Sequence, residues 1–231
     1  MPTNETIVMS VGGSLIVPDQ IDTNFLKNLK SFIDSQTAAG RRFIIIAGGG
    51  RTARRYQDAA AEVSELKSDD LDWMGIHATR LNGHLLRTIF RDSAYRVMLT
   101  NPDDIQDVPT NEKVIIASGY RPGASTDLRA VQIAKLVGAE KVINLSNTDY
   151  VYTDNPKTNP DAEKIEDITW ELFRKLLPDK WDPGLSSPFD PIAAAEAERL
   201  AMEVAQINGA NIDELRKYLD GEEFIGTKIH A

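Results

Sequence analysis

The stretch Phe43-Ile44-Ile45-Ile46-Ala47-Gly48-Gly49-Gly50-Arg51-Thr52-Ala53-Arg54-Arg55-Tyr56 joins an apolar run to three glycines and three arginines. An apolar run that ends at glycine is typical of a strand buried on both faces of a parallel sheet. Glycines let the backbone approach a ligand, and the first turn of the next helix points its N–H groups at an anion. Arg54 and Arg55 add forked donors that suit phosphate oxygens. A flexible glycine turn followed by a solvated helix face would have the same sequence. This stretch alone therefore favours neither that interpretation nor an anion site.

A second apolar run ends at glycine near the start of the chain and favours the phosphate interpretation. The run Ile7–Val11 leads into Gly12-Gly13-Ser14, and the run 114–117 leads into the loop 118–127. The two glycine loops at 12–14 and 48–50 match neither GxxxxGK[ST] nor GxGxxG, so the common nucleotide-binding fingerprints are absent there. Ligands of open α/β sheets bind outside the carboxyl ends of the strands, where all three loops are expected. The pattern therefore predicts a polyphosphate site at that edge of the sheet.

The composition restricts the class of protein. With 231 residues, 42% of them apolar, the chain can form one large α/β domain or two small ones. It has no apolar run of about 18 residues and no charged-then-apolar leader, so we expect a cytoplasmic protein without a membrane span. The net charge of −9 disfavours an extended nucleic-acid surface. Zero cysteines exclude disulfides and thiolate chemistry, and with three histidines any metal should be bound by oxygen.

Strand-like and helix-like segments alternate along the chain. Strands are expected at residues 7–11, 43–47, 95–99, 114–117 and 141–145, with an edge strand at 224–229. Helices are expected at 22–37, 51–66, 71–90, 127–137, 168–177 and 192–205, with a polar break at 67–70 and a loop at 178–191. In the helix 71–90, the residues expected to face the core are Ile76, Leu81, Leu85 and Ile89. This alternation predicts a three-layer α/β/α sandwich with a mainly parallel central sheet.

The loop 146–157 follows the strand 141–145 and carries two tyrosines among turn-forming residues. A polar loop with aromatic side chains suits an adenine base and its phosphate tail. A β-hairpin with both tyrosines on one face would give the same pattern. The two interpretations are compatible, because a hairpin can form the wall of a nucleotide site.

Several motifs occur in order along nearly the whole chain. They are GGSLIVP at 12–18, AGGGRTARRY at 47–56, DWMGIHATRLNGHLL at 72–86, STD at 125–127, YTDNPKTNPDAEKI at 152–165, FDPIAA at 189–194 and GEEFIGTKI at 221–229. No single motif is decisive, but together they resemble the amino acid kinase superfamily, most closely the uridylate (UMP) kinases of the short archaeal type. The resemblance implies transfer of a phosphoryl group from ATP to UMP with Mg²⁺. It also implies one domain over 1–231, with an acceptor half at 1–140 and an ATP half at 141–231, and a homohexamer.

The resemblance assigns a role to each residue at a matching position. Those expected around ATP are Gly12, Gly13 and Ser14 at its phosphates and Asn147, Tyr152, Asn155 and Pro156 at its adenosine. Those expected around UMP are Gly49, Gly50, Arg54 and Thr126 at its phosphate and Asp72 at its ribose. The expected catalytic residues are Arg54, Ser14 and Asp127, the last of which organises the phosphate region. No residue is assigned as a metal ligand, because Mg²⁺ is expected to bridge ATP oxygens.

The chain departs from the pattern of this superfamily at several positions. Tyr150 stands where the ATP loop of the family has glycine, and Asn155 stands where an aspartate precedes proline. The loop 118–127 reads SGYRPGASTD where short archaeal members read GGTHPGHTTD. Ser10 occupies the position of a lysine in bacterial relatives. Two of these departures lie in the nucleotide loop, so they concern the ATP site more than the UMP site.

Two alternatives to a UMP kinase follow from these departures. The chain could be a kinase for another small acceptor. It could also be a non-catalytic member of the same fold that binds a nucleotide or stores an oxyanion in a regulatory role, which Tyr150 and Asn155 favour slightly. Turnover with ATP and UMP separates these classes, whereas binding alone does not.

Overall fold

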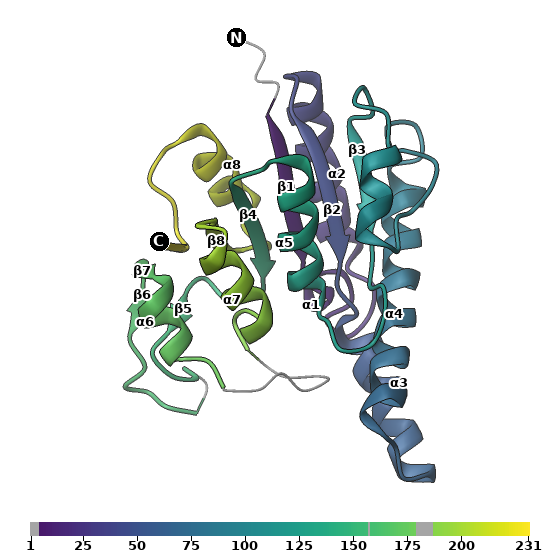
Figure 1. The fold of residues 1–231 in the computed structure, drawn as a ribbon, viewed down its shortest axis with the longest axis vertical. Coiled ribbons are helices and arrows are strands. Elements are labelled where there is room, and N and C mark those ends of the chain that lie inside the picture. Colours follow the sequence, from purple (N-terminus) through teal and green to yellow (C-terminus); the bar gives the residue numbers. More distant parts are fainter. Residues whose placement is uncertain (1–4, 157, 179–186) are drawn as a thin grey trace.

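The computed structural model describes residues 5–156, 158–178 and 187–231 (Figure 1). Its main sheet has seven strands in the order β3-β2-β1-β4-β8-β9-β7. Their bounds are β1 Thr6–Val11, β2 Arg42–Ala47, β3 Val114–Ala117, β4 Lys141–Ser146, β7 Asp167–Thr169, β8 Glu203–Asn208 and β9 Thr227–His230. All neighbours from β3 to β8 are parallel, and β9 is antiparallel to β8. The predicted, mainly parallel sheet is confirmed.

Helices cover both faces of this sheet, which gives the predicted three layers. One face carries α1 (Gly13–Ile16), α2 (Thr23–Ala38), α4 (Ser68–Ile89) and α8 (Ile212–Asp220). The other face carries the 3₁₀ helix η1 (Pro102–Asp107), α5 (Thr126–Val137), α6 (Trp170–Lys175) and α7 (Pro191–Arg199). The remaining helix, α3 (Gly50–Val63), runs beside α4 and extends beyond the sheet (Figure 1). A separate antiparallel pair, β5 (Val151–Tyr152) and β6 (Lys164–Ile165), forms a hairpin, which was one of the two interpretations of this segment.

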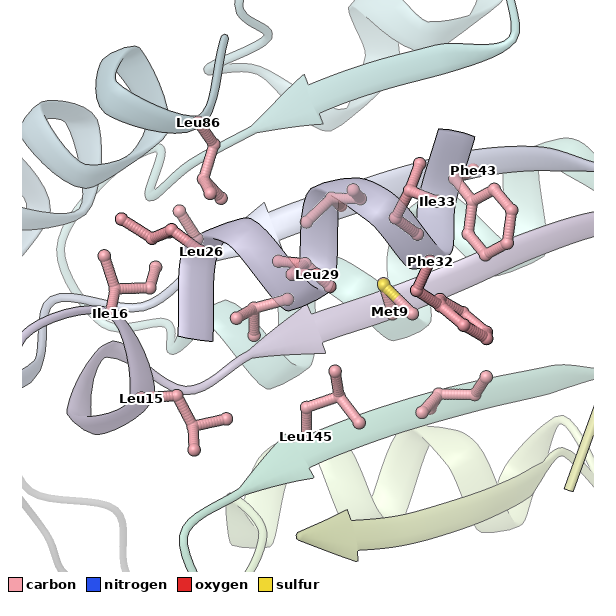
Figure 2. Packing of buried hydrophobic residues seen from close by; sticks show 14 of the residues in the cluster. Met9, Leu15, Ile16, Leu26, Leu29, Phe32, Ile33, Phe43, Leu86 and Leu145 are labelled. Carbon is pink, nitrogen blue, oxygen red and sulfur yellow. The ribbon is translucent and has the colours of Figure 1, made fainter. Parts of the chain in front are cut away.

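The side chains of the central strands alternate between two apolar clusters. Met9 of β1 belongs to the cluster under α2, whereas Val8 belongs to the cluster under α5 and α7. In Figure 2, Leu29 and Phe32 of α2 lie beside Met9. The sheet is therefore buried on both sides, as a continuous apolar run predicts. In the described part of the chain, no helix is long and apolar enough to cross a membrane.

The prediction of a strand at 95–99 is wrong. The segment touches β3 through two isolated bridges, Ala94 with Val114 and Leu99 with Ala117. Between these bridges the chain bulges away, and the side chain of Val97 is 56% exposed. A short apolar segment beside an edge strand becomes a strand only if its backbone forms a continuous ladder with that strand. Here only the two ends of the segment form bridges with β3.

The boundaries predicted in the C-terminal third are also wrong. The predicted helix 192–205 ends with α7 at Arg199, and residues from Glu203 form β8. Alanine favours a helix locally, but parallel pairing with β4 overrides that preference. Residues 167–169 form the edge strand β7 instead of the start of a helix, which leaves β9 in the interior of the sheet. The helix α8 was not predicted, and the predicted loop 178–191 lies mostly outside the described residues.

The buried face of α4 differs from the predicted one. The helix starts at Ser68, inside the predicted polar break, and Leu81 is 64% exposed. The residues of α4 that face inward are Ile76, Ala78, Thr79, Asn82, Gly83 and Leu86. Three of these are polar or lack a side chain, and an apolar pattern misses such positions. Two of them, Thr79 and Asn82, hold loops of the candidate site.

Candidate active site

The ends of β1 and β4 lie where the order of the sheet reverses. The chain passes from β1 through β2 to β3 on one side, whereas β4 and β8 lie on the other side of β1. Doubly wound sheets bind ligands at such a point, because the connections leave it in opposite directions and open a crevice. The backbone N–H of Gly12 donates to the carbonyl oxygen of Leu145 at 2.8 Å, so the first glycine loop is tied to β4 here.

The two glycine loops pack backbone against backbone. A Cβ atom on Gly13 would lie 2.0 Å from the backbone nitrogen of Gly50, and one on Gly50 would lie 2.1 Å from the carbonyl oxygen of Gly13. Gly50 also has a φ of +61°, which disfavours other residues. The structure thus brings Gly12 and Gly13 together with Gly49 and Gly50. No side chain caps the first turn of α3, where the backbone N–H of Arg51 donates to the carbonyl oxygen of Val17 at 3.4 Å. The N–H groups of Gly50 and Thr52 make no hydrogen bond within the described ranges, so they are available to an anion.

Polar side chains of α4 hold two of the loops in place. The Nδ2 atom of Asn82 donates to the carbonyl oxygens of Gly48 at 2.8 Å and Gly49 at 3.2 Å. The Oγ1 atom of Thr79 accepts a hydrogen bond from the backbone of Gly119 at 2.8 Å. Both side chains are at most 7% exposed. These buried hydrogen bonds set the distance between the second and third loops.

Arg54 differs from the two other arginines of α3. Arg55 pairs with Asp19, with Nη2 at 2.5 Å from Oδ1, and Arg51 has its Nε at 3.7 Å from the same oxygen. Arg54 is exposed and makes no hydrogen bond or ion pair with any residue of the described ranges. A charged side chain without a partner, beside an uncapped helix start, is available for an anionic ligand.

Asp72 of α4 contacts the third loop. Its Oδ2 atom accepts a hydrogen bond from the backbone N–H of Gly123 at 2.8 Å. Burial raises the pKa of this carboxyl group, the hydrogen bond from Gly123 opposes that shift, and the charge of Asp69 adds to it. The contact joins the predicted ribose-binding residue to the loop that begins α5.

A buried polar cluster joins β1, α5 and α7 below the glycine loops. The hydroxyl of Ser10 donates to Oδ1 of Asp127 at 3.0 Å, and the backbone N–H of Asp190 donates to Oδ2 of Asp127 at 3.3 Å. Burial raises the pKa of Asp127 to about 6, and the nearby charge of Asp190 adds to the shift. Asp127 therefore changes its protonation state close to neutral pH, as acids at functional sites often do.

Two predicted site residues lie at helix starts. Ser14 is half-buried in the first turn of α1, and Thr126 opens α5 behind Ser125, whose Oγ accepts from the backbone of Leu128 at 3.1 Å. Within the described ranges, neither the Ser14 nor the Thr126 hydroxyl makes a hydrogen bond. Both are therefore available to a ligand at this edge of the sheet.

The predicted adenosine residues lie on or before the β5–β6 hairpin. Asn147, Asn155 and Pro156 are exposed, and Tyr152 is half-buried. The ring of Tyr150 meets that of Tyr152 edge to face, with centroids 6.4 Å apart, and Lys164 Nζ lies 4.9 Å from the Tyr150 centroid. Gln206 Nε2 donates to the carbonyl oxygen of Tyr150 at 3.3 Å. Tyr150 has a negative φ, so the backbone conformation at this position does not require the glycine that other family members have there.

The carboxylates at this edge suit a cation that arrives with a phosphate ligand. No group of three or more potential metal ligands occurs among the residues that the structure describes. Asp190 is 4% exposed; its Oδ1 caps α7, and its Oδ2 has no hydrogen-bond partner in those same ranges. Mg²⁺ often takes one or two carboxylates and otherwise phosphate and water oxygens. Asp190 and Asp127 fit such a partial coordination shell.

Sequence reasoning missed two members of this site, Ser10 and Asp190. Asp190 carried a usable signal, because Asp followed by Pro and an alanine-rich run is typical of a helix start. Its contact with Asp127 spans 63 positions, and that of Ser10 with Asp127 spans 117. Contacts at such separation leave no local pattern.

Comparisons with known proteins agree with this architecture. The model of the amino acid kinase family matches residues 5–208. A uridylate kinase of Methanospirillum hungatei is 32% identical over 227 residues, which cover 97% of this chain and 94% of that protein. A uridylate kinase of Hyperthermus butylicus is 30% identical over 223 residues, with 96% and 97% covered.

Solved structures give the same result. The crystal structure of uridylate kinase from Archaeoglobus fulgidus has a TM-score of 0.79 and 26% identity, and the match covers 97% of this chain and 99% of that one. A UMP kinase from Ureaplasma parvum, at 18% identity, shares the fold with a TM-score of 0.77. The predicted resemblance is confirmed, and the chain belongs to the amino acid kinase family.

Proposed function

We propose that this protein transfers the γ-phosphoryl group of ATP to the phosphate of UMP, giving ADP and UDP. The observation that carries the proposal is the contact between the two glycine loops at the reversal point of the sheet, with the unpaired Arg54 in the helix that follows. This arrangement places two glycine loops, which phosphate groups can approach closely, side by side. Relatives named uridylate kinase, matched over 94–97% of their length, support UMP as the acceptor.

The proposed mechanism is in-line transfer between two positioned phosphates. Gly12, Gly13 and Ser14 hold the ATP phosphates, and the β5–β6 hairpin with its preceding loop holds the adenosine. On the acceptor side, Arg54 and the start of α3 hold the UMP phosphate, Thr126 contacts it, and Asp72 binds the ribose. Such transfer needs alignment and charge neutralisation, and no covalent intermediate with the protein.

Asp127 organises the centre of the site in this proposal. Its carboxylate is held by Ser10 and by the backbone of Asp190, so its position does not depend on a ligand. When Mg²⁺ binds with ATP, Asp127 and Asp190 would complete its coordination, and the ion would neutralise phosphate charge. Bacterial relatives have a lysine at the position of Ser10. Here Ser10 orients Asp127 and adds no positive charge.

We propose that the two substrates bind mainly to the two halves expected from the sequence. The strands β1, β2 and β3 and their loops come from residues 1–140, and β4, β8 and the hairpin come from 141–231. We assign the acceptor and the loop at the ATP phosphates to the first half and the adenosine of ATP to the second, within a single domain. The order of the sheet supports this division, because it reverses between β1 and β4.

The setting of the reaction follows from the same resemblance. We assign the protein to the cytoplasm and to pyrimidine nucleotide synthesis, acting as a homohexamer of this chain. Light scattering coupled to size-exclusion chromatography tests the hexamer, and a monomer or dimer at micromolar concentration would refute it. The activity is tested by coupled ADP release with ATP, Mg²⁺ and a panel of nucleoside monophosphates and small acids. UMP should give the highest kcat/KM, and no turnover with any acceptor would support a non-catalytic binding protein instead.

Replacing Arg54 by lysine should raise the KM for UMP about 10- to 100-fold, since a charged two-pronged contact contributes about 1.5–3 kcal/mol. The KM for ATP should stay unchanged, because Arg54 serves the acceptor alone. Initial rates at varied UMP and saturating ATP measure the effect. Arg55→Lys is the matched control, since Arg55 already pairs with Asp19. An unaltered KM for UMP in Arg54→Lys would remove Arg54 from the acceptor site.

Replacing Tyr150 by glycine should weaken ATP binding about 5- to 100-fold, because stacking of a base on an aromatic ring contributes about 1–3 kcal/mol. Tyr150→Phe keeps the ring and should bind ATP like the wild type. Equilibrium titration with a non-hydrolysable ATP analogue gives both dissociation constants. Tighter binding and faster turnover in Tyr150→Gly would show that the ring obstructs the site, which would count against the kinase proposal.

A further inference from the structure

Three arginines gather around Tyr120, at the start of the third loop. The guanidinium carbons of Arg121 and Arg129 lie 5.5 and 5.4 Å from the centroid of its ring. Arg80 of α4 donates from Nη2 to the carbonyl oxygen of Tyr120 at 3.0 Å and from Nε to that of Gly119 at 3.3 Å. We call Arg80, Tyr120, Arg121 and Arg129 the Tyr120 cluster.

None of these arginines forms an ion pair with any residue in the described ranges. Arg129 is 3% exposed; its Nη1 donates to Gln132 Oε1 at 2.6 Å, and its buried Nε has no partner there. Burial lowers the pKa of Arg129, and the positive charge of Arg121 lowers it further. A chain with a net charge of −9 and 35 acidic residues thus leaves these three arginines without an acidic partner in the described ranges.

A second buried arginine, Arg41, has hydrogen-bond acceptors and acidic partners within the protein. Arg41, 7% exposed, donates to Gln36 and, at 2.7 Å, to the carbonyl oxygen of Leu219. It also pairs with Asp220 at 3.2 Å and Glu5 at 3.4 Å. Arg129 has one side-chain acceptor, Gln132, and the ring of Tyr120, but no acid in the described ranges. The contrast shows that, within those ranges, Arg129 lacks the acidic partners that Arg41 has.

We propose that the Tyr120 cluster binds a phosphate-bearing anion at a position separate from that of Arg54. Guanidinium groups bind phosphate oxygens through paired N–H donors, and the guanidinium carbons of Arg121 and Arg129 lie 5.5 and 5.4 Å from the centroid of one ring. Arg129 is buried and oriented before binding, so little side-chain order is lost when the anion arrives. The bound anion would also relieve the repulsion between the two guanidinium groups.

Such an anion would act on the neighbouring acceptor site. The cluster belongs to the loop whose Gly123 N–H donates to Asp72 and which leads into α5 at Thr126. An anion bound to Arg121 and Arg129 would order the loop 118–127 without itself occupying the acceptor site. An effect of the anion on UMP binding rests on the proposed role of Asp72 in the acceptor site. The binding of the anion itself does not rest on that role.

Isothermal titration with inorganic pyrophosphate, orthophosphate and ribose 5-phosphate tests the site in the full-length protein. The three probes separate an inorganic anion from a phosphate monoester. Arg121→Gln is the main variant, because Arg121 is exposed and its loss should not affect folding. Arg54→Gln is the matched control at the other proposed phosphate position. Arg129→Lys, checked for folding by circular dichroism, keeps the buried charge and removes the fork.

The proposal expects at least one probe to bind about tenfold more weakly to Arg121→Gln and to Arg129→Lys, and with unchanged affinity to Arg54→Gln. Equal binding by the wild type, Arg121→Gln and Arg129→Lys would overturn it. Loss of binding in Arg54→Gln alone would also overturn it while supporting the proposed acceptor site. Loss in both Arg54→Gln and Arg121→Gln would show one shared position and refute a separate site.

Discussion

A Gly13→Ala variant should lose about 3 kcal/mol or more of unfolding free energy together with most of its phosphoryl-transfer activity. The added Cβ would lie 2.0 Å from the backbone nitrogen of Gly50 and 2.5 Å from its Cα atom. Both neighbours are backbone atoms, so relief requires the two loops to separate. Inserting a methyl group into a packed site costs about 1–3 kcal/mol, and more where the surroundings are rigid. Here they are rigid, because Asn82 holds the carbonyl groups of Gly48 and Gly49.

Urea unfolding followed by circular dichroism measures the stability, and coupled ADP release measures the activity. Gly138→Ala is the matched control. Gly138 has a φ of +68° but open space around its Cα atom, so alanine there should cost only about 1–2 kcal/mol and leave turnover unchanged. If Gly13→Ala were as stable and active as Gly138→Ala, the close contact between the loops would not be part of the working site.

The glycine loops could be predicted because their signal is local. An apolar run that ends at glycine specifies a buried strand and a close backbone approach, and both appear at β1 and β2. Asp22 likewise caps α2 at the predicted start, where its side chain accepts from Asn24 and Phe25. In each case the residues that decide the structure are adjacent in sequence. The same holds for the parallel sheet, since alternating elements permit few other arrangements.

The parts that were predicted wrongly depend on distant partners. Thr79 and Asn82 are buried because their hydrogen bonds go to loops 33 to 40 positions away. An apolar pattern placed Leu81 inside instead. Residues from Glu203 form a strand because β4 offers them a parallel partner. Local helix propensity cannot anticipate a partner of this kind.

The same limit applies to the chemistry of the site. Asp127 could be named from a motif, but its partly buried position, Ser10 as its donor and Asp190 as its neighbour are visible only in three dimensions. Arg54 could be named too, through the family motif, although the local run of charges does not separate it from Arg51 and Arg55. The structure distinguishes them through Asp19, which engages both of the others.

An Asp127→Asn variant should lose about 100- to 1000-fold in kcat and, at pH 7.5, unfold less readily than the wild type. The loss of activity is expected because a fixed charge at the transfer centre disappears while the shape is kept. The stability gain follows from the raised pKa. Burial shifts this pKa from 3.8 to about 6, so the folded state binds the proton more tightly than the unfolded state does.

The pH dependence has a definite sign. Between about pH 4 and 6 the folded protein holds more protons than the unfolded chain, so the wild-type unfolding free energy falls as the pH rises through that window. Above pH 6 the buried charge costs at most about 3 kcal/mol. Asparagine removes that cost but loses one of two accepted hydrogen bonds, worth about 1 kcal/mol. A net gain of about 1–2 kcal/mol is expected at pH 7.5, and little or none at pH 4.

Urea unfolding at pH 4, 5, 6 and 7.5 measures this difference, and wild-type kcat should decline below about pH 6 as Asp127 takes up its proton. Asp58→Asn is the control, because Asp58 is exposed on α3 and makes no hydrogen bond or ion pair in the described ranges. It should follow the wild type at every pH. An Asp127→Asn variant that is less stable at pH 7.5 would mean that the carboxylate holds β1, α5 and α7 together. An active one would remove Asp127 from the mechanism, so the two readouts separate a structural role from a catalytic one.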